Sequence, residues 1–199
     1  TVTDACGKTS TKSVTITIPA KLTISASATP AVICNGETAQ LNSTVANIVG
    51  TAVYVWTPAT GLSSTTIANP TATLTASGAS ATTTYTVQVT DDNGCAATAT
   101  TSVTVNPEVV MNTPANISVC HNASIGDIVF SSSLTGGTMS YAWTSSNSSV
   151  GGVASSGTGD IPSTVLTNTT TTAQTTTITV TPTYTANDIS CVGAQITFT

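Results

Sequence analysis

The chain has 199 residues, of which 6% are charged and 39% are hydrophobic, and its formal net charge is −5. Lysine and arginine together number three against eight acidic residues, so the chain lacks the cationic face that nucleic acid or an anionic membrane surface requires. No apolar run approaches the roughly 20 residues that span a bilayer. We therefore expect no nucleic-acid partner and no direct membrane insertion.

The composition favours a secreted, all-β protein. Charged residues are far below the roughly 25% of an ordinary domain, and threonine dominates the polar positions. Threonine can keep its hydroxyl in water while its methyl group packs on a neighbouring strand. Disorder is the alternative for a threonine-rich, charge-poor chain, but the hydrophobic residues alternate with period two where strands are expected.

A pattern of five anchor residues occurs twice in the chain. Each copy has an opening cysteine, a tyrosine two residues before a tryptophan, a second tyrosine and a closing cysteine. The opening cysteine precedes the tryptophan by 22 residues in one copy and by 23 in the other, which indicates a tandem array of one module. The anchors are Cys34, Tyr54, Trp56, Tyr85 and Cys95, then Cys120, Tyr141, Trp143, Tyr184 and Cys191. We expect the aromatic anchors to lie in the core of each module.

Residues 1–19 are predicted to be the C-terminal strand of a preceding repeat. The run Val2–Cys6, with Val14–Ile16 eight residues after the cysteine, resembles Val89–Cys95 followed by Val103–Val105. Cys6 is then the closing cysteine of that earlier repeat, and its partner lies upstream of residue 1. A free thiol in a disordered tail is the alternative.

Residues 20–106 are predicted to form a complete module of about seven short strands. Alternation and turn residues place strands near residues 22–26, 41–45, 54–56, 72–76, 85–89 and 95–105, with a turn at Cys34–Gly36 and a hairpin at Asp92–Gly94. This pattern predicts a two-sheet β-sandwich of immunoglobulin type.

Residues 107–199 are predicted to form a second sandwich with a longer insert after its tryptophan. Inward faces are expected at Ile128 and Phe130, at Met139–Trp143 and at Ile178–Tyr184, with a last strand at 195–199. The serine- and glycine-rich stretch 145–159 is expected to be loop.

The similar position of each cysteine pair within its module predicts disulfides between Cys34 and Cys95 and between Cys120 and Cys191. Cys6 is then unpaired within the chain. A bridge closing about sixty residues contributes on the order of 4 kcal/mol through the unfolded state. Zinc binding by the cysteines and a histidine is the alternative, but the ligand spacing does not match.

We expect no catalytic, cofactor-binding or metal site. Asp91–Gly94 lacks the spaced acidic ligands and distal glutamate of a calcium loop, so an Asx-type hairpin turn is favoured. His121 is the single histidine, and no nucleophile and orienting acid can be matched to it. Glu37 and Glu108 fall in different modules and predict no catalytic pair.

Four runs in residues 20–106 carry a resemblance to a known family: Cys34–Thr38, Tyr54–Leu62, Asn69–Thr71 and Thr82–Cys95. They are similar to the Ig-like and PKD-like repeats of very large surface adhesins of Bacteroidota, and residues 107–199 resemble the PKD-like variant. The resemblance implies export by the type 9 system, attachment to the outer membrane through other parts of the precursor, and roles in adhesion or gliding motility.

Three functions stay open. The first is a structural spacer whose modules project an adhesin from the cell, with neighbouring repeats of the same polypeptide as partners. The second is a lectin-like module that binds surface glycans or other cell-surface proteins, although few aromatic residues are available for it. The third is an accessory domain of a secreted enzyme. In none of them is this segment itself an enzyme.

Overall fold

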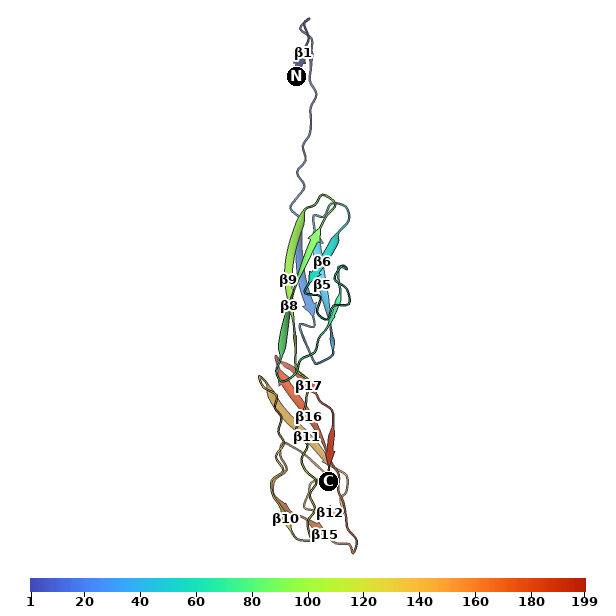
Figure 1. Ribbon diagram of the computed structural model, residues 1–199, viewed down its shortest axis with the longest axis vertical. Coiled ribbons are helices and arrows are strands. Elements are labelled where there is room, and N and C mark those ends of the chain that lie inside the picture. The colour runs from blue at the N-terminus through green and yellow to red at the C-terminus, as the bar shows by residue number, and fades with distance from the viewer.

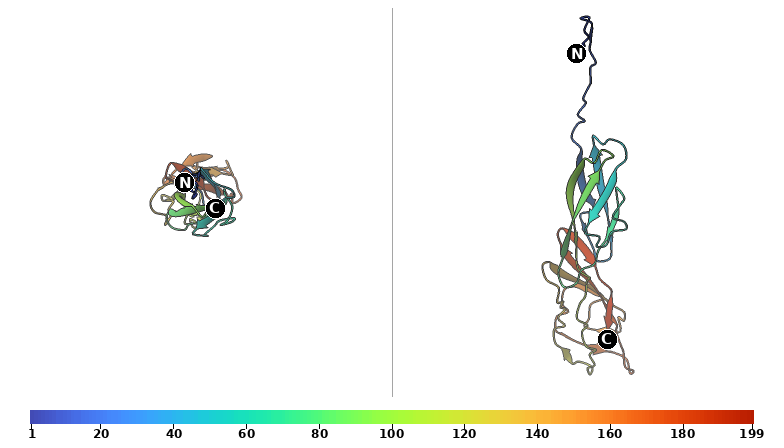
Figure 2. Two further views of the ribbon diagram at one scale, coloured as in Figure 1. Left: turned by 90° about the horizontal axis from the view of Figure 1, so that it is seen from above. Right: turned by 45° about the horizontal axis from the view of Figure 1, so that its top comes forward.

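The computed structural model describes all 199 residues and is built from β-strands and loops alone, as the composition predicted. None of its segments is a helix long and apolar enough to cross a membrane. The molecule is elongated, with the strands of residues 20–106 and 107–199 following one another along its long axis (Figure 1). Seen from above, the two groups of strands lie over each other (Figure 2).

The first twenty residues lie apart from the rest of the molecule. They form a small hairpin of β1 (Val2–Thr3) and β2 (Thr9–Ser10), followed by an extended stretch that leads to β3. Every residue of this segment is exposed. Its assignment to a preceding repeat stays a prediction.

We call residues 20–106 the N-terminal module and residues 107–199 the C-terminal module, and their folding as separate domains stays a prediction. The N-terminal module contains a three-stranded and a four-stranded sheet, with strand orders β3-β5-β7 and β4-β9-β8-β6. This matches the two-sheet pattern of an immunoglobulin-type sandwich. Its strands are β3 (Thr23–Thr29), β4 (Val32–Ile33), β5 (Thr38–Ala46), β6 (Val53–Thr57), β7 (Thr71–Thr73), β8 (Ala81–Thr90) and β9 (Ala96–Val105). The sequence missed only the two-residue β4.

The core of this module lies between its two sheets. Leu41 comes from one sheet and Trp56, Tyr85 and Val87 from the other, and none of them is more than 1% exposed. The Tyr85 hydroxyl donates to the carbonyl oxygen of Thr60 at 2.6 Å, and burial raises the pKa of Tyr85 above its ordinary value. Successive side chains of a strand point to opposite faces, and this alternation buries Trp56 and Tyr85, whereas the predicted anchor Tyr54 is only partly buried beside them.

Threonine side chains lie on the outer face of the larger sheet, as the composition suggested. The hydroxyl groups of Thr82 and Thr104 lie 2.8 Å apart across β8 and β9, and those of Thr84 and Ser102 lie 2.9 Å apart. Such cross-strand hydroxyl pairs stabilise antiparallel strands without charged side chains.

The C-terminal module, residues 107–199, is organised around one five-stranded sheet. The order is β13-β11-β16-β17, and β18 also pairs with β16, while two further two-stranded sheets are β10-β14 and β12-β15. The strands are β10 (Ser124–Ile125), β11 (Thr138–Ser145), β12 (Val150–Gly151), β13 (Ser156–Thr158), β14 (Thr164–Val165), β15 (Thr167–Asn168), β16 (Ile178–Ala186), β17 (Ile189–Val192) and β18 (Ile196–Phe198). No strand of this module pairs with one of the other.

One expectation for the C-terminal module was confirmed in part and another was wrong. Ile128 and Phe130 are buried, but they lie outside any named strand, and Ile128 makes only an isolated bridge to Ile161. The stretch 145–159 is not all loop, because β13 within it pairs with β11. A side chain on Gly157 of β13 would collide with the Trp143 indole, so glycine here serves the packing of a strand against tryptophan.

The second tyrosine of the repeated pattern does not hold the same structural place in the two modules. Trp56 pairs with Val87, two residues after Tyr85. Trp143 pairs with Val180, four residues before Tyr184. The order of residues in the sequence therefore matched two tyrosines that lie six positions apart in register relative to their tryptophans.

Candidate functional site: the disulfide-linked junction

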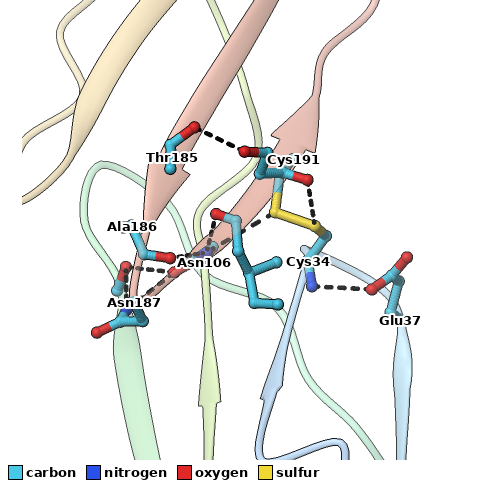
Figure 3. The surroundings of a disulfide bond; sticks show 10 residues. Cys34, Glu37, Asn106, Thr185, Ala186, Asn187 and Cys191 are labelled. Carbon is cyan, nitrogen blue, oxygen red and sulfur yellow. Dashed lines mark hydrogen bonds between the residues drawn. A yellow bond between two sulfur atoms is a disulfide. The ribbon is translucent and has the colours of Figure 1, made fainter.

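The two modules are joined by a disulfide. It links Cys34 with Cys191 across 157 residues of sequence, and the two Cα atoms are 5.6 Å apart (Figure 3). Cys34 follows β4 of the N-terminal module, and Cys191 lies in β17 of the C-terminal module. The bond therefore closes the junction between the modules.

This pairing corrects the predicted disulfides Cys34–Cys95 and Cys120–Cys191. In the structure Cys6, Cys95 and Cys120 are free and exposed. A disulfide needs Cα atoms within about 7 Å of each other. The predicted partners fail that condition because they lie at opposite ends of their modules.

The strand register shows why Cys34 and Cys95 are far apart. Cys95 directly precedes β9, whereas Cys34 directly follows β4, and β4 runs parallel to the other end of β9 with Ile33 beside Val105. A ten-residue strand is about 30 Å long. The length of β9 therefore separates the two sulfur atoms.

A similar separation holds in the C-terminal module. The backbone N–H of Asn122, two residues after Cys120, donates to the carbonyl oxygen of Leu166 at 2.9 Å. This places Cys120 near β10 and β15, at the end of the module opposite β17 (Figure 1).

A turn presents the Cys34 sulfur at the junction. The Glu37 carboxylate accepts the backbone N–H of Cys34 at 2.9 Å (Figure 3). The Glu37 N–H also donates to the Cys34 carbonyl oxygen at 3.0 Å. Glu37, for which the sequence predicted no catalytic partner, is thus part of a turn.

Asn106 is the central polar residue of the junction. It is completely buried, and its side-chain N–H donates to the carbonyl oxygen of Ala186 at 3.0 Å (Figure 3). Its side-chain oxygen accepts hydrogen bonds from the Ser80 hydroxyl at 2.8 Å and from the Asn187 amide at 3.1 Å. One side chain thereby bonds to both modules. The sequence predicted only that residue 106 ends the first module, and no pattern marked its side chain.

Backbone hydrogen bonds add to these contacts. The N–H of Glu108 donates to Ala76 at 3.0 Å, and the N–H of Thr135 donates to the carbonyl oxygen of Gly78 at 2.9 Å. Both bonds run from the C-terminal module to the loop between β7 and β8. The junction is therefore held at several points around the disulfide.

A small apolar cluster fills the remaining space beside the disulfide. Its buried members come from the C-terminal module, and Cys34 of the N-terminal module packs against them. The buried residues are Val109, Tyr184, Ala186 and Cys191. Because Tyr184 is fully buried and its hydroxyl donates to Thr135 at 2.8 Å, this anchor belongs to the junction and not to the main core.

The other candidate residues do not gather into a site. His121 Nδ1 accepts the backbone N–H of Asn168 at 3.1 Å in an exposed turn. The Asp91 carboxylate accepts the N–H groups of Asn93 and Cys95, both at 2.9 Å, which is the Asx-type turn that the sequence favoured. No three histidine, cysteine or acidic side chains lie together as a metal site would require.

A cavity of about 430 Å³ opens in the C-terminal module, where β10, β12 and β15 form part of its walls. Its walls are mainly apolar, with His121 and the side chains of Ile117, Val119, Leu166 and Phe198 among them. This cavity could not be predicted from the sequence, because its walls come from stretches of chain spread between residues 116 and 199.

Comparison with known proteins yields no family model and no curated protein that matches this chain. Among solved structures, murine CEACAM1b is similar over 88% of this chain and 98% of its own, at 12% identity and a TM-score of 0.39. The N-terminal domains of the bacteriophage RB49 outer capsid protein Hoc match over 89% of this chain and 58% of their own, at 17% identity and a TM-score of 0.34. Protocadherin gamma B7 matches over 88% and 49%, at 12% identity and a TM-score of 0.34. Scores of this size define no relationship, so the fold assignment rests on the strand order described above.

Replacing Asn106 by alanine is expected to lower the free energy of unfolding by about 1–3 kcal/mol, because buried partners on both modules lose their hydrogen bonds. Denaturant unfolding followed by circular dichroism measures the loss. Asn112→Ala is the matched control, since the Asn112 side chain bonds only to Ser131 in an exposed position. Equal losses in the two variants would show that Asn106 has no special place at the junction.

Proposed function

We propose that this chain is a structural and adhesive repeat segment of a large cell-surface protein, in which disulfide-linked modules act as a spacer that projects an adhesin from the cell. The observation that carries the proposal is the Cys34–Cys191 bond, which joins two consecutive modules end to end. Flexible linkers let neighbouring domains move independently. A covalent bond together with the buried Asn106 instead favours a fixed direction along the array.

The disulfide also supports an extracellular location, because structural disulfides persist in oxidising compartments. The resemblance of Cys34–Thr38 and Thr82–Cys95 to Bacteroidota adhesin repeats supports the finer proposal. In that proposal the segment is exported by the type 9 system, is held at the outer membrane by other parts of the precursor, and serves adhesion or gliding motility without being an enzyme. Its partners are neighbouring repeats and, through the adhesin, surface glycans or other cell-surface proteins.

Small-angle X-ray scattering of the whole chain tests the spacer function. The pair distribution of the oxidised protein is expected to be that of a rod, and it should broaden in a variant with Cys34→Ala and Cys191→Ala, because the modules can then bend at residues 106–107. A compact particle with the modules side by side would contradict the proposal.

The cavity of the C-terminal module favours a binding module as the second candidate function. Its volume lies within the range of small-ligand sites, and a few polar groups such as His121 and Gln174 accompany the apolar walls. Glycan-array binding by the whole chain that is lost in Gln174→Ala, and kept when the exposed loop residue Ile67 is changed, would favour this candidate over a simple spacer.

A further inference from the structure

The Cys120 turn reproduces the Cys34 turn in its backbone geometry. In each turn the cysteine carbonyl oxygen accepts the N–H of the residue three positions later at 3.0 Å. The residue two positions later has a positive φ, 78° at Gly36 and 63° at Asn122. The N–H of that same residue donates to a leucine carbonyl oxygen at 2.9 Å in both turns. Cys120 is thus the structural counterpart of a cysteine that forms an inter-module bond.

Cys191 has a definite register in its own sheet. Trp143 of β11 pairs with Val180 of β16, and Tyr184 lies four residues further along β16. Tyr184 is directly opposite Cys191 on β17.

Cys95 has a corresponding register in the N-terminal module. Trp56 pairs with Val87, and Asp91 lies four residues further along the chain. The Asp91 N–H donates to the Cys95 carbonyl oxygen at 3.0 Å. Cys95 therefore occupies a position in the β8–β9 hairpin that corresponds to the position of Cys191 in the β16–β17 hairpin.

Two of the three free cysteines, Cys95 and Cys120, lie toward opposite ends of the molecule. Cys95 lies at the β8–β9 hairpin, at the end from which the N-terminal segment leaves, and Cys120 lies beside β10 at the other end (Figure 1). Both are exposed. One end of the chain thus has a cysteine in a turn like that of Cys34. The other end has a cysteine in a hairpin like that of Cys191.

We propose that Cys120 and Cys95 are the two halves of a second disulfide-linked junction, in which the Cys120 turn of one molecule joins the Cys95 hairpin of a second copy of this chain. Because the two surfaces differ, the contact is head-to-tail and extends into an open linear array instead of closing into a symmetric dimer. Each module then bonds through its opening cysteine to the closing cysteine of the module that follows.

The chemistry is thiol–disulfide exchange with a small disulfide such as oxidised glutathione. The Cys120 thiolate attacks that disulfide, forms a mixed disulfide and releases one glutathione thiolate. The Cys95 thiolate of the second molecule then attacks the Cys120 sulfur and releases the other. The two cysteine thiols are oxidised, one molecule of oxidised glutathione is reduced to two thiols, and the electrons balance.

This inference rests on the proposed spacer function, but separate measurements test the two. Scattering of the single chain examines the existing Cys34–Cys191 junction. Cross-linking between chains examines the new one, so either can fail alone.

The test is oxidation of the concentrated, full-length chain in a glutathione redox buffer, followed by acid quenching, non-reducing electrophoresis and mass spectrometry of peptic peptides. We expect a ladder of covalent oligomers in which the peptide containing Cys95 is bonded to the peptide containing Cys120. Cys95→Ser alone and Cys120→Ser alone should each abolish the ladder. A mixture of these two variants should give dimers and nothing longer, because each molecule keeps only one half of the junction.

Cys6→Ser is the matched control, because Cys6 is also a free, exposed thiol. Its ladder should equal that of the unmodified chain. Symmetric links between two Cys95 or two Cys120 residues, a ladder that depends on Cys6, or the absence of cross-linking would each overturn the inference.

Discussion

The Trp56→Ala variant is expected to lose about 3–5 kcal/mol of unfolding free energy, as other large aromatic side chains do when they are deleted from a core. Trp56 is 1% exposed, and its indole N–H donates to the Ile67 carbonyl oxygen at 3.0 Å. The substitution removes packing between the two sheets and leaves that carbonyl without its partner. Denaturant unfolding followed by circular dichroism gives the difference.

Val55→Ala provides the matched control for this change. Val55 is the neighbouring residue of β6, its side chain points to the opposite face, and it is 44% exposed. Its loss should stay within about 0.5 kcal/mol, as for most surface substitutions. A Trp56→Ala loss no larger than that of Val55→Ala would show that the tryptophan does not hold the sheets together.

Removing the disulfide by combining Cys34→Ala with Cys191→Ala is expected to destabilise the folded chain by about 5 kcal/mol, on the loop-closure entropy of the unfolded state. The estimate is larger than for the predicted bridges because the closed loop spans 157 residues. Calorimetry or denaturant unfolding under non-reducing conditions measures the change.

Cys95→Ala combined with Cys120→Ala is the control for the disulfide variant, since it also removes two cysteines but breaks no bond. We expect its stability to stay within about 0.5 kcal/mol of the unmodified chain. An equal loss in both double variants would mean that the disulfide contributes nothing beyond the side chains that form it.

The sandwich of residues 20–106 could be predicted from sequence because its signals are local. Period-two alternation depends only on neighbouring residues, and it correctly placed Trp56 and Val87 facing inward. The C-terminal module was less predictable. The side chains of Ile128 and Phe130 fill its core from a segment without regular pairing, so burial there does not come with a strand.

The junction could not be predicted from the same signals. The location of Cys34 depends on β4, which has two residues and leaves no periodic trace. Asn106 is recognisable as important only through Ala186 and Asn187, about eighty residues away in sequence. Similar spacing within each copy identified cysteines at equivalent positions. Equivalent positions do not reveal which two cysteines form a disulfide.

The position of the Cys34–Cys191 bond has a mechanical consequence for a chain pulled from its two ends. Tension passes from residue 34 directly to residue 191 through the sulfur atoms, so the 157-residue loop between them carries no load. Only residues 1–34 and 191–199 can be drawn out, a contour of ~150 Å compared with ~700 Å for the whole chain at about 3.5 Å per residue. Force on the two ends would then draw out β3 and β4 together with the N-terminal segment, but the strands from β5 to β16 would stay unloaded while the bond is intact.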